Sequence, residues 1–370
     1  MKHVVSRRRF VLGSSAALSL GIISGTTSSQ PAAALKVPTV DSLVVQIVTD
    51  SSYDTPRAMS HKLVKVRRKG FTAAPNTKTL HSEWGLAMTL ESRIGTDTRN
   101  LMLDFGYTPE ALVNNIEFIG VDPSKIQGLI MSHGHFDHFG GLIGFLEKYR
   151  SRLPADLTLY AGGEENFCNR KSGTGVPGHF ADWGVLDRRE LTRLNVKVVL
   201  CPQPTVIHGH AFTTGTIPRA SFETIFPSSQ VLYRKRADGV GCDMPAEDAK
   251  WKGEYAKQDN HLHEHATCYN VKDRGLVVIS SCGHTGIINS VRQAMAVSGV
   301  SKVHAVMGGF HLFPADDTYL RRVVAELETL NPDVLIPLHC SGPEMVQVVR
   351  AVSPGKLLTS TTGTEFTFGV

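Results

Sequence analysis

The feature that most constrains this chain is a histidine-rich turn that directly follows a short apolar strand. Residues 128–131, Gly-Leu-Ile-Met, have the apolar run of a buried strand. His133, His135, Asp137 and His138 come next, so three imidazoles and one carboxylate lie within six positions. Imidazole nitrogen and carboxylate oxygen together suit zinc, iron or manganese. The pattern therefore indicates a metal site rather than packing.

The spacing within this turn divides its ligands between two ions. Side chains two positions apart on an extended chain point the same way, so we expect His133 and His135 to share one ion. Asp137 and His138 lie beyond the bend and can face a second ion, and Asp137 is also the candidate catalytic residue. We expect two divalent ions, zinc first, with iron or manganese as the other candidates. Further ligands must come from other strand ends.

The His-x-His-x-Asp-His motif resembles that of the metallo-β-lactamase superfamily, in which it holds a two-metal hydrolytic centre. Other segments resemble one subgroup, the metal-dependent hydrolases that include dihydropterin ribofuranosyl-aminobenzene phosphate synthase. These segments are Glu-Trp-Gly-Leu at 83–86, Leu-Met-Leu-Asp-Phe-Gly at 101–106, Ser-Cys-Gly-His-Thr-Gly-Ile-Ile-Asn at 281–289, Gly-Gly-Phe-His-Leu at 308–312 and Pro-Leu-His-Cys at 337–340. The resemblance covers about residues 41–345, nearly the whole chain after its leader.

Apolar periodicity predicts the regular elements. Strands are expected at 43–48, 85–91, 100–104, 128–131, 157–160, 196–200, 266–271, 275–280, 303–307 and 334–338, and helices at 109–119, 141–149, 286–297 and 317–330. The basic stretch 62–69 is expected to be a connection. Two β-rich halves with helices outside predict a four-layer αββα sandwich, an α/β (α+β) fold. Residues 150–265 match the superfamily least, and we expect them to be an insertion that faces the substrate.

The resemblance also implies the remaining ligands of the first ion. His284, in the Gly-His-Thr turn after strand 275–280, matches the third histidine of the superfamily. A competing alignment places Cys282 between the two ions and takes the third histidine from His208 or His210. Both alignments remain open at this point.

The second ion is expected to take its last histidine from His339, which follows an apolar strand. His311 stands where the superfamily usually has a bridging aspartate, so we expect it near the second ion, which an imidazole bridges less well. Asp104 resembles the aspartate that orients the ligand turn by accepting an imidazole N–H. Its alternative role is that of a turn residue.

Two other groups of side chains have open roles. Arg219 matches a subgroup motif and is a candidate to bind a substrate anion, but a salt bridge with Glu223 four residues on is an equal alternative. His261, His263 and His265 alternate along the chain. We favour a solvated or channel-lining face for them over another metal site.

The N-terminus predicts export. Residues 6–12, Ser-Arg-Arg-Arg-Phe-Val-Leu, resemble a twin-arginine signal, and a short apolar stretch with small residues follows. We therefore expect a signal peptide at 1–34, a metallo-β-lactamase-fold domain at 35–370, and a bacterial periplasmic or secreted protein. The expected partners are the twin-arginine export machinery and a small-molecule substrate. We expect no stable membrane span after cleavage, and an uncleaved anchor is the alternative.

Net charge and cysteine content bear on two further questions, nucleic-acid binding and disulfide formation. The formal net charge is +5, and part of it lies in the leader, so no nucleic-acid partner is expected. The six cysteines are an even number, which suggests disulfides in an exported protein. Folding in the reducing cytoplasm before export argues against them.

These observations favour a metal-dependent hydrolase. A metal-activated hydroxide would attack an ester, lactone, amide or phosphoester, with Asp137 orienting the nucleophile. A serine nucleophile is disfavoured because no Gly-x-Ser-x-Gly motif is present. The alternatives are a synthase-like enzyme acting on a pterin-related substrate and a non-catalytic metal-loaded binding protein.

Overall fold

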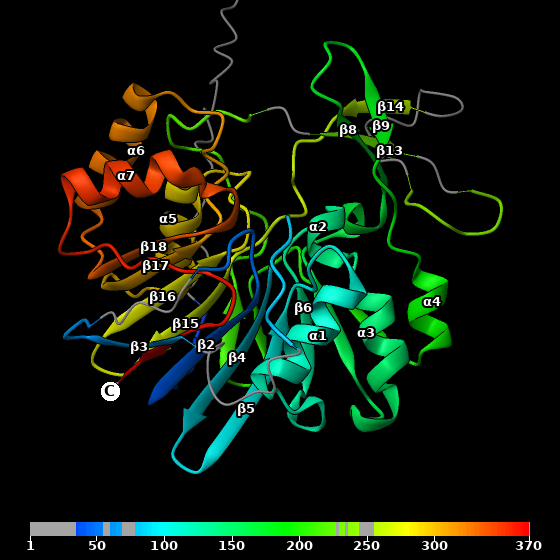
Figure 1. Cartoon of the computed structure of the whole chain (residues 1–370), viewed down its shortest axis with the longest axis horizontal. Coiled ribbons are helices and arrows are strands. Elements are labelled where there is room, and N and C mark those ends of the chain that lie inside the picture. Colours follow the sequence, from blue (N-terminus) through cyan, green and yellow to red (C-terminus); the bar gives the residue numbers. More distant parts are fainter. Residues whose placement is uncertain are drawn as a thin grey trace, which may run out of the picture. The chain divides into compact units, whose positions relative to one another are not determined.

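Two β-sheets pack face to face at the centre of the fold, with helices on both outer sides (Figure 1). The computed structural model describes residues 35–54, 60–68, 78–226, 229–233, 236–243 and 255–369. The predicted export signal at residues 1–34 lies outside these described residues. Among the described residues, no helix is both long and apolar enough to cross a membrane.

The first sheet carries the metal-binding turn. Its strand order is β10 (Lys197–Leu200), β7 (Thr158–Ala161), β6 (Gly128–Met131), β5 (Asp97–Leu103), β4 (Ala87–Ile94), β2 (Ser42–Thr49), β19 (Thr364–Phe368) and β3 (Val64–Arg68). Strands β5, β6 and β7 run parallel, so their carboxyl ends meet at one edge. The basic stretch at 62–69, expected to be a connection, instead contains the edge strand β3. In β3 the buried Val64 alternates with the exposed Lys65, which is typical of a half-buried strand at the edge of a sheet. Charged side chains on such an edge hinder pairing with a further strand.

The second sheet carries the other candidate ligands. Its strand order is β11 (Thr205–Ile207), β12 (Ala211–Thr213), β15 (Thr267–Val271), β16 (Gly275–Ser280), β17 (Val303–Gly308) and β18 (Val334–Pro337), and β1 (Thr39–Val40) also pairs with β15. The predicted hairpin is present, since β15 pairs antiparallel with β16. Strands β16, β17 and β18 are parallel neighbours, so the residues that follow them emerge side by side.

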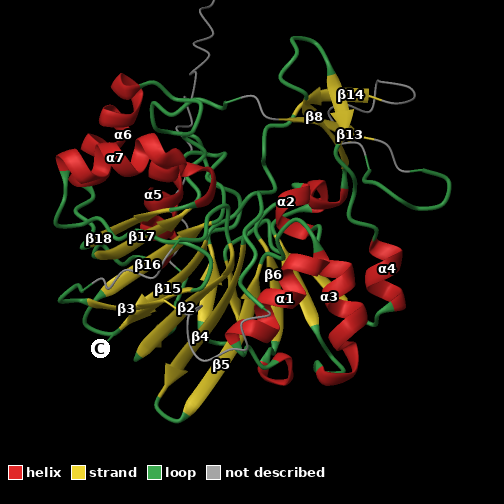
Figure 2. Ribbon diagram, in the orientation of Figure 1, coloured by secondary structure: helices red, strands yellow, loops and turns green. Residues whose placement is uncertain are grey.

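Helices cover the outer face of each sheet (Figure 2). The helices are α1 (Pro109–Ile119), α2 (Phe136–Phe139), α3 (Leu142–Tyr149), α4 (Arg188–Arg193), α5 (Ile287–Ser298), α6 (Asp317–Thr329) and α7 (Gly342–Val352). Helix α1 has the predicted bounds because Thr108 caps its first turn and Gly120, at φ 80°, ends it.

Three apolar clusters define the layers. Fully buried residues of both sheets, such as Leu103 and Met307, form the central cluster. A second cluster packs α1 and α3 on the first sheet, and a third packs α5, α6 and α7 on the second sheet. The four-layer αββα sandwich predicted from the sequence is therefore confirmed.

A small third sheet is formed within residues 150–265, the segment that the sequence predicts to be an insertion and that we call the insertion. Its order is β14 (Tyr255–Gln258), β13 (Ser229–Tyr233), β8 (Asn169–Gly173) and β9 (Phe180–Asp182). Figure 1 shows these strands together beyond the edge of the sandwich where α2 lies. Antiparallel pairing joins β13 to β8, which are nearly sixty residues apart in the chain.

Candidate metal centre and its pocket

The candidate ligands meet at the edge where parallel strands of both sheets end. His133 follows β6, His284 follows β16, His311 follows β17 and His339 follows β18. All four side chains are buried. The convergence of strand ends predicted from the sequence is thus the arrangement that the structure has.

The first group of donors gathers around His284. Its ring centroid lies 4.9 Å from that of His133 and 4.6 Å from that of His135. The donor atoms of His133, His284 and Cys282 lie within 4.8 Å of one another, and so do those of His135, His284 and His261. The three histidines predicted for the first ion are therefore neighbours.

The second group lies beside the first. The donor atoms of His138, His339 and Cys282 also lie within 4.8 Å of one another. Asp137 Oδ2 is 3.5 Å from His339 Nε2 and 3.7 Å from His138 Nε2. Burial opposes ionisation of Asp137, but the neighbouring imidazoles outweigh burial and lower the pKa of its carboxyl. The residues predicted for the second ion are thus close together around an ionised carboxylate.

Unpartnered buried atoms test whether these residues suit a divalent ion. Several buried donor atoms have no hydrogen-bond partner within the described part of the chain: His133 Nε2, His138 Nε2, Asp137 Oδ1 and both ring nitrogens of His284 and His339. Such groups are costly unless something binds them. Burial lowers the pKa of His133 and of His284 well below the usual value, so both rings are neutral with a free lone pair. The donor set fits metal ions of the zinc, iron or manganese type.

Asp104 orients two residues of the ligand turn. Its carboxylate accepts hydrogen bonds from the Ser132 backbone N–H at 2.8 Å and from Ser132 Oγ at 2.7 Å. His138 Nδ1 lies 2.8 Å from Asp104 Oδ2, which leaves His138 Nε2 to face the cluster. This contact is the arrangement expected of an aspartate that fixes an imidazole for metal binding. Asp104 also has a positive φ of 57°, so it is a turn residue as well.

The competing alignment has two parts, a central Cys282 and a third histidine from His208 or His210, and the structure agrees with the first part only. Cys282 lies at the centre, because its sulfur belongs to three of the donor groups. His210 lies elsewhere, with Nδ1 3.0 Å from Ser92 Oγ, and His208 packs against Tyr160. Neither His208 nor His210 joins a donor group among the described residues.

His311 lies between the two groups, nearer to the first. Its ring centroid is 4.0 Å from that of His284, and its Nδ1 is 3.8 Å from Cys282 Sγ. It shares a donor group with Cys282 and Cys340, whose sulfur atoms are 3.1 Å apart. His311 and His339 both have positive φ, 48° and 50°, a strained conformation for residues other than glycine that is typical of functional sites.

The structure contradicts one of the two roles considered for Arg219, the salt bridge with Glu223, and it contradicts a solvated face for the alternating histidines. Arg219 makes no bond with Glu223; it donates to the Asn260 carbonyl at 2.6 Å, while Glu223 accepts from the N–H groups at the start of α5. His261 and His263 are buried rather than solvated, and so is His265. Their chain segment turns inward, where the His261 ring stacks on His284 with centroids 4.0 Å apart.

Glu264 is a site residue that the sequence did not single out. Its buried carboxylate accepts hydrogen bonds from the backbone N–H groups of Gly283, His284 and Thr285 at 2.7–3.0 Å. It therefore fixes the turn that presents His284. In the sequence, the one feature that indicated a role for Glu264 in the site was its position within the run His-Leu-His-Glu-His.

A buried ion pair joins the insertion to the ligand turn. Arg170 Nε donates to Asp259 Oδ2 at 2.7 Å, and both side chains are fully buried. Arg170 Nη1 also donates to the Gly134 carbonyl at 2.9 Å. A Cβ on Gly134 would lie 2.5 Å from the Asn166 carbonyl, so only glycine allows this close approach.

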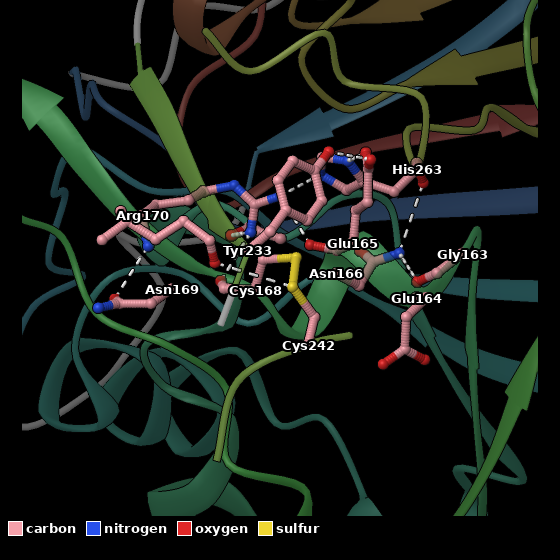
Figure 3. Close-up of a disulfide and its surroundings, with 12 residues drawn as sticks. Gly163, Glu164, Glu165, Asn166, Cys168, Asn169, Arg170, Tyr233, Cys242 and His263 are labelled. Carbon is pink, nitrogen blue, oxygen red and sulfur yellow. Dashed lines mark hydrogen bonds and ion pairs between the residues drawn. A yellow bond between two sulfur atoms is a disulfide. The ribbon is translucent and has the colours of Figure 1, made fainter. Parts of the chain in front are cut away.

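A disulfide links Cys168 and Cys242 beside this ion pair (Figure 3). The even number of cysteines and the expected folding in the cytoplasm left disulfide formation open, and the structure has this one bridge among the six cysteines. Figure 3 shows Arg170 and Tyr233 close to the bridge, and Tyr233 donates to the Glu165 carboxylate. Cys201, Cys268, Cys282 and Cys340 are free.

A pocket of about 590 Å³ opens over the candidate ligands. His135, Asp137 and His284 lie on its floor, and the insertion contributes residues 172–183 to one wall. Trp84 and Phe313, whose rings pack against each other, also line it. A small molecule in this pocket would lie directly against the donor groups.

Comparisons with known proteins agree with this architecture. Residues 92–217 match the model of the metallo-β-lactamase superfamily. A crystal structure described as a metal-dependent hydrolase of the β-lactamase superfamily superposes with a TM-score of 0.61 and 19% identity over 87% of this chain and 98% of that one. The chain has the metallo-β-lactamase fold.

Two curated proteins of Methanocaldococcus jannaschii are distant homologues of this metallo-β-lactamase-fold chain. One is named 7,8-dihydropterin-6-methyl-4-(β-D-ribofuranosyl)-aminobenzene-5'-phosphate synthase and is 26% identical over 267 residues, 70% of this chain and 82% of its own length. The other is an uncharacterized protein, 23% identical over 255 residues, 67% of this chain and 82% of its own length.

Proposed function

We propose that this protein is a metal-dependent hydrolase that cleaves an ester, lactone, amide or phosphoester. The observation that carries the proposal is the convergence of buried, unpartnered imidazole nitrogens and one carboxylate on the floor of an open pocket. His133, His135 and His284 would hold one ion, and Asp137, His138 and His339 the other. Bound divalent ions of this kind acidify water and polarise a substrate oxygen.

The protein's own groups would then position the reactants. Asp137 stays ionised because its pKa is lowered, and its Oδ1 has no partner. A carboxylate with a low pKa is a weak base, so its main role would be to orient the attacking water by accepting a hydrogen bond. Asp104 and Glu264 would hold the ligand turns in place. Trp84 would shield the site, since its ring lies 5.1 Å from that of His339.

A panel of hydrolysis assays tests this proposal. Metal-loaded protein should hydrolyse at least one member of a series of esters, lactones, amides and phosphoesters, and chelated protein should hydrolyse none. The His133→Ala variant is the control for contaminating activity. A folded, metal-loaded protein without turnover on the whole panel would instead favour a binding protein.

A second candidate function is a synthase-like reaction on a pterin-related substrate. The 26% identical relative named as a synthase supports it. Arg219 is a candidate for an anionic substrate group, but it does not line the pocket. Formation of a condensed product from a pterin precursor, without hydrolysis of any panel member, would favour this candidate.

We also propose export to the periplasm by the twin-arginine route. The Ser-Arg-Arg-Arg-Phe-Val-Leu segment supports this route. The Cys168–Cys242 disulfide supports only an oxidising destination, since disulfides persist in oxidising compartments. The paired substitution Arg7→Lys and Arg8→Lys should block export. Normal periplasmic yield of that variant would contradict the proposal.

A further inference from the structure

Exposed apolar side chains gather at one place on this protein. Among the described residues, seven large apolar side chains are exposed, and four of them line the pocket over the candidate metal centre. These four are Trp84, Val176, Phe180 and Phe313, which are 47%, 56%, 43% and 49% exposed. Exposed apolar groups that cluster in a concave site mark a binding surface rather than random exposure.

The aromatic groups come from separate parts of the chain and touch the candidate ligands. The rings of Trp84 and Phe313 pack edge to face, with centroids 5.9 Å apart. Trp183, from the insertion, lies 4.7 Å from the ring of His135. The apolar walls thus reach down to the floor of the pocket, so a group bound between them would lie next to the reacting bond.

The remaining polar lining consists of amide and hydroxyl side chains and of one imidazole, that of His179. Gln230 and Gln258 face each other across β13 and β14, and Ser172 and Ser229 face each other across β8 and β13. Amide and hydroxyl groups both donate and accept hydrogen bonds, so they suit carbonyl, amide or hydroxyl groups of a neutral ligand.

No Lys or Arg side chain lines this pocket among the described residues, and Asp137 is its one charged carboxylate there. Phosphate groups are usually bound by Arg or Lys side chains. The nearby Arg170 is buried and already bonded to Asp259 and to backbone carbonyls. Apart from the His179 imidazole, the described walls therefore offer an anionic substrate no cationic side chain.

From these observations we propose that the pocket takes an uncharged acyl substrate, an ester or lactone, with an aromatic or bulky apolar group beside the scissile bond. This inference rests on the proposed hydrolytic function. Hydrolysis of such an ester adds the oxygen of water to the acyl carbon and breaks the acyl carbon–oxygen bond. The products are the carboxylic acid and the alcohol, which takes up the proton.

Three chromogenic substrates distinguish an ester with an aromatic acyl group from a small ester and from a phosphodiester. Metal-loaded full-length protein is assayed with 4-nitrophenyl phenylacetate, 4-nitrophenyl acetate and bis(4-nitrophenyl) phosphate. We expect kcat/KM for the phenylacetate to exceed that for the acetate by at least about tenfold, because a buried aromatic group adds apolar contact. The anionic phosphodiester should be the poorest substrate. A phosphodiester that exceeds the phenylacetate, or an acetate equal to it, would overturn the proposal.

Phe180→Ala provides a matched variant, because this exposed side chain touches the pocket but no candidate ligand ring. It should raise KM for the phenylacetate by about fivefold or more and change the acetate little. Val352→Ala, which removes an exposed apolar group of α7 outside the pocket, is the control and should change neither. An equal change of KM for the phenylacetate in Phe180→Ala and Val352→Ala would contradict the role of the pocket in binding the aromatic group.

A binding measurement separates this inference from the proposed function. Calorimetric titration of chelated protein with phenylacetamide, which is neutral, should show binding that weakens in Phe180→Ala. Phenyl phosphate should not bind. Binding of phenylacetamide without turnover of any ester would support the ligand class and remove the hydrolase proposal. Absence of phenylacetamide binding, or preferential binding of phenyl phosphate, would overturn the ligand class even if hydrolysis is found.

Discussion

The two sides of the pocket are built in different ways. On one side, candidate ligands follow the ends of parallel strands, whose positions the packed sheets fix. On the other side, residues of the insertion reach the site from turns and short strands. Buried contacts that are distant in sequence hold this second side, chiefly the Arg170–Asp259 pair and the Cys168–Cys242 disulfide.

This difference suggests a division of roles. The strand ends provide a rigid set of donors for metal ions. The insertion provides the wall that shapes the pocket, together with side chains such as His261 that pack against the donors. Changes on the first side should therefore act on metal content and chemistry, and changes on the second side on stability and specificity.

The sharpest test of this division compares His133 with His261. His133→Ala should remove bound metal and lower kcat/KM by more than about a hundredfold, beyond the range usual for outer partners of a metal site. His261→Ala should retain most of the metal, because His133, His135 and His284 would still hold the first ion without it. Metal analysis by plasma mass spectrometry and kinetic assays measure both effects. A greater metal loss in His261→Ala than in His133→Ala would contradict this division of roles between the strand ends and the insertion.

The next largest effect is expected from the buried ion pair. Arg170→Met leaves the Asp259 carboxylate buried and unpaired, which should lower the free energy of unfolding by about 3–5 kcal/mol. Arg193→Met removes exposed ion pairs that solvent screens, so it should lower the free energy of unfolding far less. Urea unfolding followed by circular dichroism compares them. Similar losses in the two variants would show that the buried pair does not stabilise the insertion.

Loss of the disulfide should have a somewhat smaller effect. The bridge closes a loop of 74 residues, so the double variant Cys168→Ser and Cys242→Ser should lose about 2–4 kcal/mol of unfolding free energy. Wild-type protein unfolded in the presence of a reductant is the matched comparison and should behave in the same way. An unchanged midpoint in both would mean that the bridge does not restrain the chain.

The most gradual effect concerns pH. Burial lowers the pKa of His135 to about 4 and the pKa of His311 to about 3. The unfolded chain therefore binds more protons below about pH 6.5, and stability falls as pH falls through this range. Chelated protein should lose up to about 1.4 kcal/mol per pH unit for each such histidine. His311→Asn should show a shallower slope between pH 6.5 and 4; an identical slope would contradict the assignment.

The sandwich and its strand ends could be predicted from the sequence better than the insertion could. The strands, the helices and the sandwich could be predicted because apolar periodicity and capping act locally, as at Thr108 and Gly120. The neighbours of His133 could also be predicted, because each candidate ligand comes directly after an apolar strand. Strand β3 was missed because its basic residues hid the alternation with Val64 and Val66.

The insertion could not be predicted for a physical reason. Its strands β8 and β13 pair only after folding brings them together, and nothing near Cys168 in the sequence indicates Cys242 as its partner. His261, His263 and His265 alternate like a solvated strand but are buried. Glu264, in the same run, accepts a hydrogen bond from the backbone N–H of His284. Such contacts between distant residues leave no periodic signal in the sequence.

The metal content of two variants tests the central claim most directly. His284 has two unpartnered ring nitrogens in the donor cluster, whereas the Cys282 sulfur already contacts Cys340. Purified wild-type protein should hold about two divalent ions per chain, as two-metal hydrolytic sites do. We predict that His284→Ala loses about one ion and its activity, while Cys282→Ser keeps both ions. Full metal content in His284→Ala, with loss of metal in Cys282→Ser, would contradict the assignment of the strand-end histidines.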